Sequence, residues 1–500
     1  MRNTSILAAA IVAASTGVAH AQCPAGSSDI TGSVPAAALT ATNASFACSL
    51  AGVYDGSAPA PTLTQTDGGN LWVLDGKVEI GNEQDVQAVD SQSFGVVTAD
   101  PDPTTLTIDP GAVIVGTGAV GGASDDYLII HRGNMLDAEG AVDNPIRFQS
   151  MQSIDGTGGD RAQWGGLYIN GYASINNCGA TPPAGQACMK YGEAGTGTYG
   201  GGTDTDNSGI LKYVTVANAG FAFTSTSEFN GIAFQGVGSG TEVDYIQVDQ
   251  NQDDGVEFFG GTVNVKHVVL TANRDDSFDV TGGWSGAAQY VLVYQPAGLP
   301  HDRGFEIDGK GTFEPADGVV SNITVISDSA ANKDGGSSDG IKSREDNALT
   351  YINSVIHMTA GSHDCYDADV NTSSLVAAYG DCTFGSQDLQ DGTFGSGAAV
   401  AYTADFNGYI NGLSEAIQPG VNANAQDSRL DAVSFVGAVE SCENDWTQGW
   451  TIPGTLPAVN AAACAENSAA QVNVPVMGWA GLLALFGGLT GIAAVRRRIV

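Results

Sequence analysis

Two short stretches, "NQDDGVEFFGG" at residues 251–261 and "NRDDSFDVTGG" at residues 273–283, repeat one pattern at an interval of 22 residues. Each has an Asn, a double Asp, a small residue, an apolar–acidic–apolar triplet and a Gly-Gly pair. The triplet alternates with the two-residue period of a β-strand. A strand that recurs at this interval indicates stacked coils, in which each coil places the same residue type at the same position.

The pattern extends well beyond these two copies. One unit, Gly–apolar–x–apolar–x–Gly, recurs as "GLYING" (166–171), "GIAFQG" (231–236), "GVEFFG" (255–260), "SFDVTG" (277–282), "GFEIDG" (304–309) and, in degenerate form, "GIKSRE" (340–345). A second unit, apolar–x–Tyr/His/Asn–apolar–x–apolar, alternates with it as "LKYVTV" (211–216), "VDYIQV" (243–248), "VKHVVL" (265–270), "AQYVLV" (288–293) and "VSNITV" (320–325). Both units are short and rich in β-formers, which favours strands over helices.

An all-β solenoid follows from these units. We expect a right-handed parallel β-helix over residues 105–380, because parallel connections are right-handed and stacking buries the apolar side chains that one coil leaves bare. Residues 22–104 are expected to form an N-terminal capping region, and residues 381–470 an irregular, disulfide-bearing C-terminal capping region. We expect Trp446 and Trp450 of "NDWTQGW" to cover the open end of the solenoid. A sugar-stacking pair is the alternative.

The two ends of the chain have the features of targeting segments. Residues 1–21 combine Arg2, an apolar run and Ala19-His20-Ala21, as in a secretory signal peptide. Residues 474–498 hold an apolar stretch that ends in three arginines, which is long enough to span a bilayer. "VPVMGW", the apolar stretch and "RRR" resemble exosortase-type C-terminal sorting signals of Gram-negative bacteria. The resemblance implies a processing enzyme as partner; a permanent anchor is the alternative.

Composition supports an exported protein. The chain has 55 acidic and 18 basic residues and a net charge of −37, which argues against nucleic acid as a partner and favours cations. Eight cysteines in an exported chain predict disulfides. Pairing between sequence neighbours is the simplest arrangement, and it gives Cys23–Cys48, Cys178–Cys188, Cys365–Cys382 and Cys442–Cys464.

Several motifs occur in an order that resembles a widespread family of exported bacterial β-helix surface proteins. They are "TLTIDPGAVIVG" (105–116), "WGGLYING", "SGILKYVTVANAG", "GVGSGTEVDYIQV", "DDGVEFFGGTVNVKHVV" and "FVGAVESCENDWTQGWT". The resemblance implies the β-helix fold and an exported, cell-surface or extracellular location, with envelope or matrix components as partners. It implies no particular activity.

The middle residue of the first unit points away from the core, because strand side chains alternate between faces. Down the stack these residues are Tyr168, Ala233, Glu257, Asp279, Glu306 and Lys342. Adjacent coils lie about 4.8 Å apart. We therefore predict that Glu257, Asp279 and Glu306 form an acidic ladder on the outer surface and serve as a binding site, where a bound cation would relieve their repulsion.

A catalytic interpretation rests on the order of a second set of residues. Asp254, Asp276, His301, Lys342 and Arg344 follow a sequence of acidic turns, a His turn and a basic strand that is similar to polygalacturonase-type β-helix hydrolases. Two carboxylates suit glycoside hydrolysis. "HDRG" and "GIKSR" depart from the hydrolase motifs, however. The structural alternative is that Asn and Asp accept hydrogen bonds from turn N–H groups.

One loop has the composition of a calcium site. "DTDNSG" (204–209) would offer Asp204, Asp206 and Ser208 as metal ligands, although Thr215 stands where an EF-hand has Glu. The leading functional hypothesis is a non-enzymatic, cell-surface or secreted structural or adhesive protein, stabilised by calcium. The alternative is a polysaccharide-active hydrolase or lyase of the pectinase-like β-helix type, acting through carboxylates on the outer face.

Overall fold

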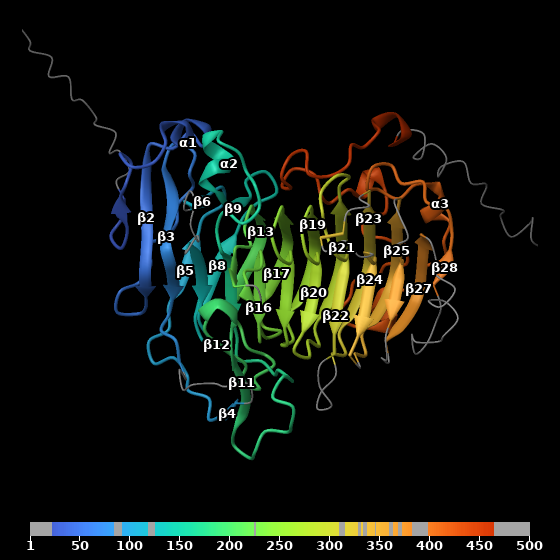
Figure 1. The fold of residues 1–500 in the computed structure, drawn as a ribbon, viewed down its shortest axis with the longest axis horizontal. Helices are drawn as coiled ribbons and strands as arrows, with labels where there is room; N and C mark the ends of the chain where they lie inside the picture. Colours follow the sequence, from blue (N-terminus) through green and yellow to red (C-terminus); the bar gives the residue numbers. More distant parts are fainter. Residues whose placement is uncertain are drawn as a thin grey trace, which may run out of the picture.

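The computed structural model describes residues 23–84, 93–118, 126–224, 227–309, 316–328, 332–333, 338–345, 347–359, 364–368, 373–382 and 399–464. They form one long solenoid, shown in Figure 1 with its axis horizontal. Nearly all its strands belong to one parallel sheet system that winds along the axis. The predicted parallel β-helix is confirmed.

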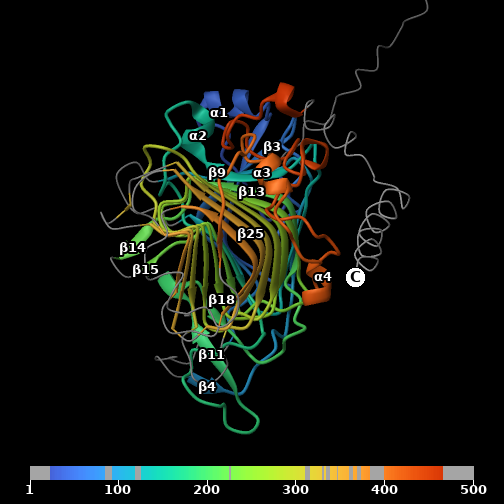
Figure 2. The ribbon, with the colours of Figure 1, turned by 90° about the vertical axis from the view of Figure 1, so that its right-hand side faces the viewer.

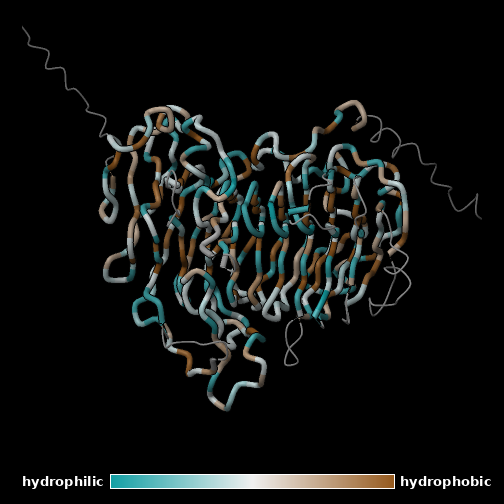
Figure 3. The backbone as a smooth tube through the Cα atoms, in the orientation of Figure 1, coloured by the Kyte–Doolittle hydropathy of each residue, from teal (hydrophilic) through white to brown (hydrophobic). Residues whose placement is uncertain are grey.

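The Gly–apolar–x–apolar units form one column of short strands, here called the short-strand column. Its strands pair in parallel and in register, for example Val256 opposite Phe278 and Phe258 opposite Val280. The apolar residues face inward as predicted, and Phe258 packs against its neighbour Phe278 with ring centroids 5.0 Å apart and the rings tilted by 34°. Figure 3 shows hydrophobic and hydrophilic residues alternating along these strands. The column consists of β7 (Tyr127–Ile130), β10 (Gly166–Asn170), β16 (Ile232–Gln235), β18 (Val256–Phe259), β20 (Phe278–Thr281), β22 (Phe305–Asp308), β24 (Ile341–Arg344) and β26 (Tyr366–Ala368).

The second unit forms a column of longer strands, each bent at its centre. The bend is the Tyr, His or Asn of the unit, or Ala377 in the last strand. The backbone is left-handed there, with φ from 49° to 61° at Tyr213, Tyr245, His267, Tyr290, Asn322, Asn353 and Ala377. Asn and His tolerate this conformation better than most residues. The bent-strand column consists of β13 (Gly209–Ala217), β17 (Glu242–Asp249), β19 (Asn264–Thr271), β21 (Ala287–Gln295), β23 (Val319–Ser327), β25 (Thr350–Met358) and β27 (Ser374–Asp381).

The parallel stack begins ahead of residue 105, where the sequence analysis places its start. β2 (Phe46–Tyr54) pairs in parallel with β3 (Asn70–Ile80), which pairs with both β6 (Val113–Gly116) and β7. β5 (Thr105–Ile108) pairs with β8 (Met135–Glu139), and β6 with β9 (Ile146–Ser150). On the next coil, the first half of β13 pairs with β8 and its second half pairs with β9. A bent strand therefore consists of two arms joined at one residue. β1 (Ser28–Asp29) pairs with β2 in antiparallel fashion, and α1 (Ala36–Ala41) contacts α2 (Met151–Asp155) at this end.

A side insertion, residues 171–208 between β10 and β13, covers the outer face of the short-strand column. It includes β11 (Ala187–Tyr191), η1 (Glu193–Gly195) and β12 (Thr198–Tyr199), and β11 also pairs with β4 (Ser93–Gly95). Figures 1 and 2 show β4 and β11 projecting from one side of the coils. A second apolar cluster lies beneath the insertion and includes Tyr168, Tyr199, Phe229 and Phe259.

The C-terminal strap, residues 403–464, corrects the expectation of an end cap. After β28 (Val400–Ala401) the chain forms α3 (Leu413–Ala416), α4 (Ala423–Gln426) and η2 (Cys442–Asn444), and it runs back along the side of the bent-strand column. Figure 2, which looks along the solenoid, shows α4 beside the coils. Asn353 contacts Val421, whereas the much earlier Tyr213 contacts Trp450.

The two tryptophans therefore pack against the flank of the solenoid. The rings at the bends form an aromatic stack, Tyr213–Tyr245–His267–Tyr290, with successive centroids 4.4, 4.1 and 4.7 Å apart. Trp450 lies edge-on to Tyr213 and Tyr245, and Trp446 to His267. The bends expose a continuous column of rings along the flank, and this apolar surface needs covering as much as an open end does.

All four predicted disulfides are present, namely Cys23–Cys48, Cys178–Cys188, Cys365–Cys382 and Cys442–Cys464. They are consistent with an exported protein. Among the described residues, no helix is both long and apolar enough to cross a bilayer. The predicted signal peptide (1–21) and sorting segment (474–498) lie outside the described residues.

Candidate functional site

The predicted ladder exists in register. Glu257 lies opposite Asp279, Asp279 opposite Glu306, and Glu306 opposite Lys342 on consecutive coils of the short-strand column. We call Glu257, Asp279 and Glu306 the acidic ladder. The expectation that it lies on an open surface is wrong, because Glu257 is only 8% exposed and Glu306 only 9%. Residues of the side insertion, among them Glu193 and Tyr199, line one pocket together with the ladder. Strand periodicity carries no information about such a cover.

The acidic ladder faces a pocket of about 730 Å³ between the short-strand column and the side insertion. Five of its lining residues are acidic, whereas Lys190 and Arg344 are the two basic residues in its lining. The full lining is Asn176, Asn177, Gly179, Lys190, Tyr191, Glu193, Tyr199, Glu257, Phe259, Asp279, Thr281, Glu306, Asp308 and Arg344. The pocket therefore combines acids with a few donors, as a site for a cation or a polar ligand requires.

Burial dominates the electrostatics of the acidic ladder. It raises the pKa of Glu257 to about 8, and the nearby negative charge of Glu193 adds to the shift. Burial is also the main cause that raises the pKa of Asp279 well above its ordinary value, and the negative charge of Glu257 is the second cause. Glu306 differs because it forms ion pairs with Arg303 and Arg344, each at 2.6 Å. One end of the acidic ladder is thus neutralised by arginines, and the other end is not.

The two residues of the double Asp in the opening motif have different roles. The second Asp of each pair fastens one coil to the next: Asp254 Oδ1 accepts a hydrogen bond from the Asp276 N–H at 3.0 Å, and Asp276 Oδ1 accepts one from the Arg303 N–H at 2.7 Å. The buried Asn251 Nδ2 donates to the Asp254 carbonyl within the same turn. Asp254 and Asp276 therefore accept hydrogen bonds from turn N–H groups, as the structural alternative expects, but the donors belong to the next coil and not to the same turn.

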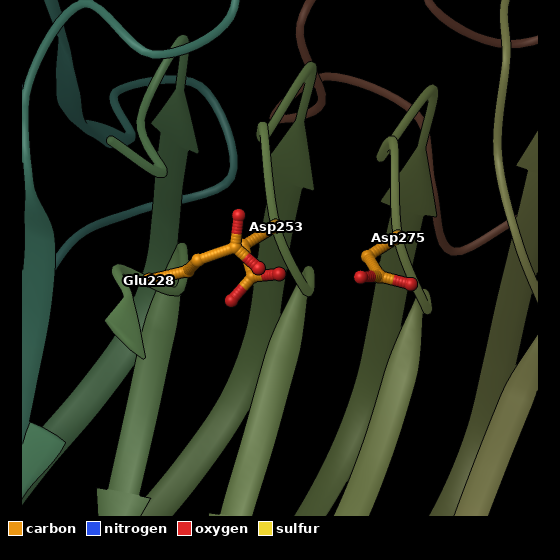
Figure 4. A group of neighbouring side chains, drawn as sticks. All are labelled: Glu228, Asp253 and Asp275. Atoms are coloured by element: carbon orange, nitrogen blue, oxygen red, sulfur yellow. The ribbon is translucent and has the colours of Figure 1, made fainter. Parts of the chain in front are cut away.

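The first Asp of each pair faces away from the turn backbone. Figure 4 shows Asp253 and Glu228, from β15 (Ser227–Glu228), directed toward each other, with Asp275 on the next coil. One carboxylate oxygen from each lies within 4.8 Å of the others. Asp275 forms an ion pair with Lys333, whereas burial and the charge of Glu228 raise the pKa of Asp253 well above its ordinary value.

A second group of three carboxylates joins the turn to the acidic ladder. One oxygen from each of Asp254, Glu257 and Asp279 lies within 4.8 Å of the others. Beside them the buried Asn230 donates from Nδ2 to Glu257 Oε2, and its Oδ1 has no hydrogen-bond partner among the described residues. Asp279 Oδ1 is likewise buried, without a hydrogen bond from the described part of the chain. We call Asp254, Glu257, Asp279 and Asn230 the oxygen cluster.

Sequence reasoning missed Asn230 and Glu228, although a signal for Asn230 was present. Ile232 pairs with Val256, so Asn230 occupies on its coil the position that Asp254 occupies on the next. Extending the repeat alignment upstream of "GIAFQG" would have found it. Glu228 belongs to an inserted hairpin of β14 (Ala222–Thr224) and β15, which has no counterpart in the repeat.

The catalytic candidates do not meet in one open groove. Arg344 lines the pocket, but Asp254, Asp276, His301 and Lys342 do not. His301 is 1% exposed and its ring contacts Ser327 Oγ, at the end of a bent strand. Lys342 forms an ion pair with Asp367 on the following coil. Asp254 and Asp276 do lie together, with one carboxylate oxygen from each within 4.8 Å of the other. His301 and Lys342 have partners elsewhere on the coils, so the similarity to polygalacturonases does not extend to one shared groove.

The predicted calcium loop has structural contacts of its own. Asp204 Oδ1 accepts a hydrogen bond from the Ser174 N–H, and Asp206 Oδ2 accepts one from the Tyr172 N–H, each at 2.9 Å. Ser208 is buried, and its N–H donates to Thr241 Oγ1 at 2.9 Å. The first two bonds lie within the side insertion, and the third ties its last residue to Thr241 of the stack. Calcium binding by Asp204, Asp206 and Ser208 stays a prediction.

The fold and the pocket define a class of parallel β-helix proteins with a carboxylate-lined site on the outer face of one strand column. The model of the pectate-lyase-like β-helix domain family matches residues 96–451, and the chain belongs to this family. Comparisons with curated proteins and with solved structures found no match. The family match supports the fold and carries no activity to this chain.

Proposed function

We propose that this chain is an exported, non-enzymatic β-helix protein of the cell surface or extracellular space, stabilised by calcium at the oxygen cluster. One observation carries the proposal: the buried Asp254 and Glu257 and the half-buried Asp279 converge, and Glu257 has no ion pair with Lys or Arg among the residues that the structure describes. A buried, unpaired carboxylate is costly, and a divalent cation removes that cost. Its partners would be envelope or matrix components, including polysaccharide.

The oxygen cluster has suitable chemistry for calcium. Calcium takes six to eight oxygen ligands from carboxylates, amide carbonyls and water. Asp254, Glu257 and Asp279 supply carboxylate oxygens, and the amide of Asn230 offers the unpaired Oδ1 after a rotation about its last torsion. Waters from the adjoining pocket would complete the coordination.

Calcium titration of the EDTA-treated protein tests this proposal. A ligand that binds only the folded state stabilises it by about 2.7 kcal/mol at 100 times its Kd. We expect calcium to raise the melting temperature of the wild type and of the control Asp75→Asn, an exposed acid on β3. Asp279→Asn should lose the calcium response while remaining folded. An unchanged response in Asp279→Asn would rule out the oxygen cluster.

A second function has one specific observation in its favour. Glu257, with a pKa of about 8, shares the pocket with Asp308 and Arg344. A carboxyl that keeps its proton at neutral pH can act as a general acid, a second carboxylate can activate water, and an arginine can bind an acidic sugar. The protein would then be a polysaccharide hydrolase or lyase.

Incubation of the purified exported protein with acidic polysaccharides separates the two functions. Reducing ends would report hydrolysis, and an unsaturated, ultraviolet-absorbing product would report elimination. The scaffold function predicts no turnover. Turnover that disappears in Glu257→Gln but persists in Asp75→Asn would instead establish the enzyme.

A further inference from the structure

An ion pair between Lys333 and Asp275 joins two segments that precede different strands of the short-strand column. Asp275 precedes β20 and Lys333 precedes β24, and β22 lies between these two strands. The backbone is anchored on both sides of the pair. The Lys333 N–H donates to the His301 carbonyl at 2.9 Å, and the Asp275 carbonyl accepts a hydrogen bond from the Asp302 N–H at 3.2 Å. These backbone hydrogen bonds hold the amine and the carboxylate against each other.

The Lys333–Asp275 pair is enclosed more than several other lysine ion pairs of the protein. The side chain of Lys333 is 17% exposed and that of Asp275 is 13% exposed. By comparison, Lys342 pairs with Asp367, whose side chain is 27% exposed. The lysines of three further pairs are 28% to 32% exposed, namely Lys77, Lys212 and Lys266. Among these pairs, water competes least for the two groups of Lys333 and Asp275, so these groups stay in contact.

A carboxyl group that can carry a proton lies beside the pair. Asp253 is 9% exposed, and one of its oxygens lies within 4.8 Å of an oxygen of Asp275 and of an oxygen of Glu228. Figure 4 shows Asp253 and Glu228 directed toward each other, and the hydrogen bond between them requires a proton on one of the two. Burial, followed by the charges of Glu228 and Glu257, raises the pKa of Asp253 well above its ordinary value, although Lys333 acts in the opposite direction. Asp253 can therefore serve as an acid.

We propose that Lys333 and Asp275 condense into an intramolecular amide bond, with Asp253 as the proton donor. Groups that a fold holds in contact react far faster than free groups, with effective molarities of about 10⁵ to 10⁸ M in well-oriented cases. A purely structural ion pair would need neither the enclosure nor the acid beside it. No residue of the oxygen cluster takes part, so the inference does not depend on the proposed calcium site.

The reaction balances without any further reactant. A proton passes from the ammonium of Lys333 to the carboxylate of Asp275, which gives an amine and a carboxylic acid. Lys333 Nζ then attacks Asp275 Cγ, and a C–N bond forms. The C–O bond to one hydroxyl breaks as Asp253 donates a proton to that hydroxyl, and one water leaves. Asp253 regains a proton from the nitrogen, so it ends the reaction as it began.

The amide bond would close the chain between residues 275 and 333 into a ring. It would link the turn before β20 to the segment before β24, across the coil of β22. Thiols reduce disulfides by exchange and do not cleave amides, so this link would persist where the four disulfides are reduced.

Mass spectrometry of the purified, reduced and denatured protein tests the proposal. We expect the wild type to be lighter by one water than Lys333→Arg, after correction for the substitution itself. Lys333→Arg keeps the ion pair but forms no such amide, and the comparison cancels any processing of the chain ends. A protease digest of the wild type should contain one branched peptide that joins residue 275 to residue 333. A wild type without the loss of water would overturn the proposal, and so would a water lost within one linear peptide, as in a cyclised Asp254-Gly255.

Two further variants test the roles of the individual groups. Asp275→Asn should form the same amide by releasing ammonia, so its crosslinked form and the crosslinked wild type should have equal masses. Asp253→Asn should remain largely uncrosslinked, because general acid catalysis contributes about 10²- to 10⁴-fold. The exposed control Asp75→Asn should crosslink like the wild type. Complete crosslinking in a folded Asp253→Asn would overturn the role of Asp253. If that variant fails to fold, the wild-type mass and the branched peptide still decide the proposal.

Discussion

The acidic ladder and the aromatic stack are both columns of equivalent residues, each covered by another segment of the chain. In the aromatic stack, rings follow one another at 4.1 to 4.7 Å and each contact is favourable. In the acidic ladder, Glu257, Asp279 and Glu306 follow one another on consecutive coils and repel. A solenoid repeats the residues of one register position on successive coils. Stacked rings at such a position stabilise the fold, whereas like charges destabilise it. This repulsion between carboxylates destabilises the unliganded fold, and it is the reason why the acidic ladder is a candidate binding site.

Removal of a ring contact should produce the largest effect. Trp450 is 1% exposed and covers Tyr213 and Tyr245, so Trp450→Ala should destabilise the protein by about 3 to 5 kcal/mol in urea unfolding. The exposed Leu413→Ala on the same strap should change stability by less than about 0.5 kcal/mol. Similar values for both would mean that the strap does not stabilise the stack.

Opening the cover of the acidic ladder should have the next largest effect. Cys178→Ala with Cys188→Ala removes a disulfide that closes a short loop of the side insertion, which should cost about 2 to 3 kcal/mol. It should also increase hydrogen exchange in β11 and β12, measured by mass spectrometry. Unchanged exchange there would show that the insertion holds without its disulfide.

The pH dependence of stability tests the burial of the ladder directly. Glu257 has a pKa of about 8 in the folded protein against an ordinary 4.5, so the folded state holds the extra proton between these values. Stability of the calcium-free protein, measured by urea titration, should therefore fall as the pH rises from about 4.5 to about 8. Calcium should reduce this slope, since it replaces the proton. Stability that increases over this range would contradict the raised pKa.

The smallest effect concerns the bends that create the aromatic stack. Ala377 has φ of 53°, a conformation that costs alanine more than glycine. Ala377→Gly should stabilise the protein by about 0.5 to 1 kcal/mol in thermal unfolding. Ala378→Gly, at the next position of β27, should destabilise it, because that residue continues the strand and is buried. The same sign for both variants would argue against a left-handed bend.

The sequence alone determined the coil, because each coil repeats the same local pattern and such a pattern can be recognised directly in the amino-acid sequence. Val256 and Phe258 point inward on either side of an outward residue, the ladder positions align in register, and cysteines pair with their sequence neighbours. The Tyr, His or Asn of the second unit was visible as a repeated type, but its left-handed backbone was not. Periodicity reports which face a side chain takes and says nothing about a bend between two arms.

Only the tertiary structure decided what covers each face. The side insertion buries Glu257 and turns a presumed surface ladder into a pocket, and the strap brings Trp446 and Trp450 back to coils more than 150 residues earlier in the chain. Both segments lack the repeat, so nothing in their local pattern specifies where they dock. Their placement depends on the summed burial of apolar and polar surface across the whole solenoid, a quantity that exists only once the coils have stacked.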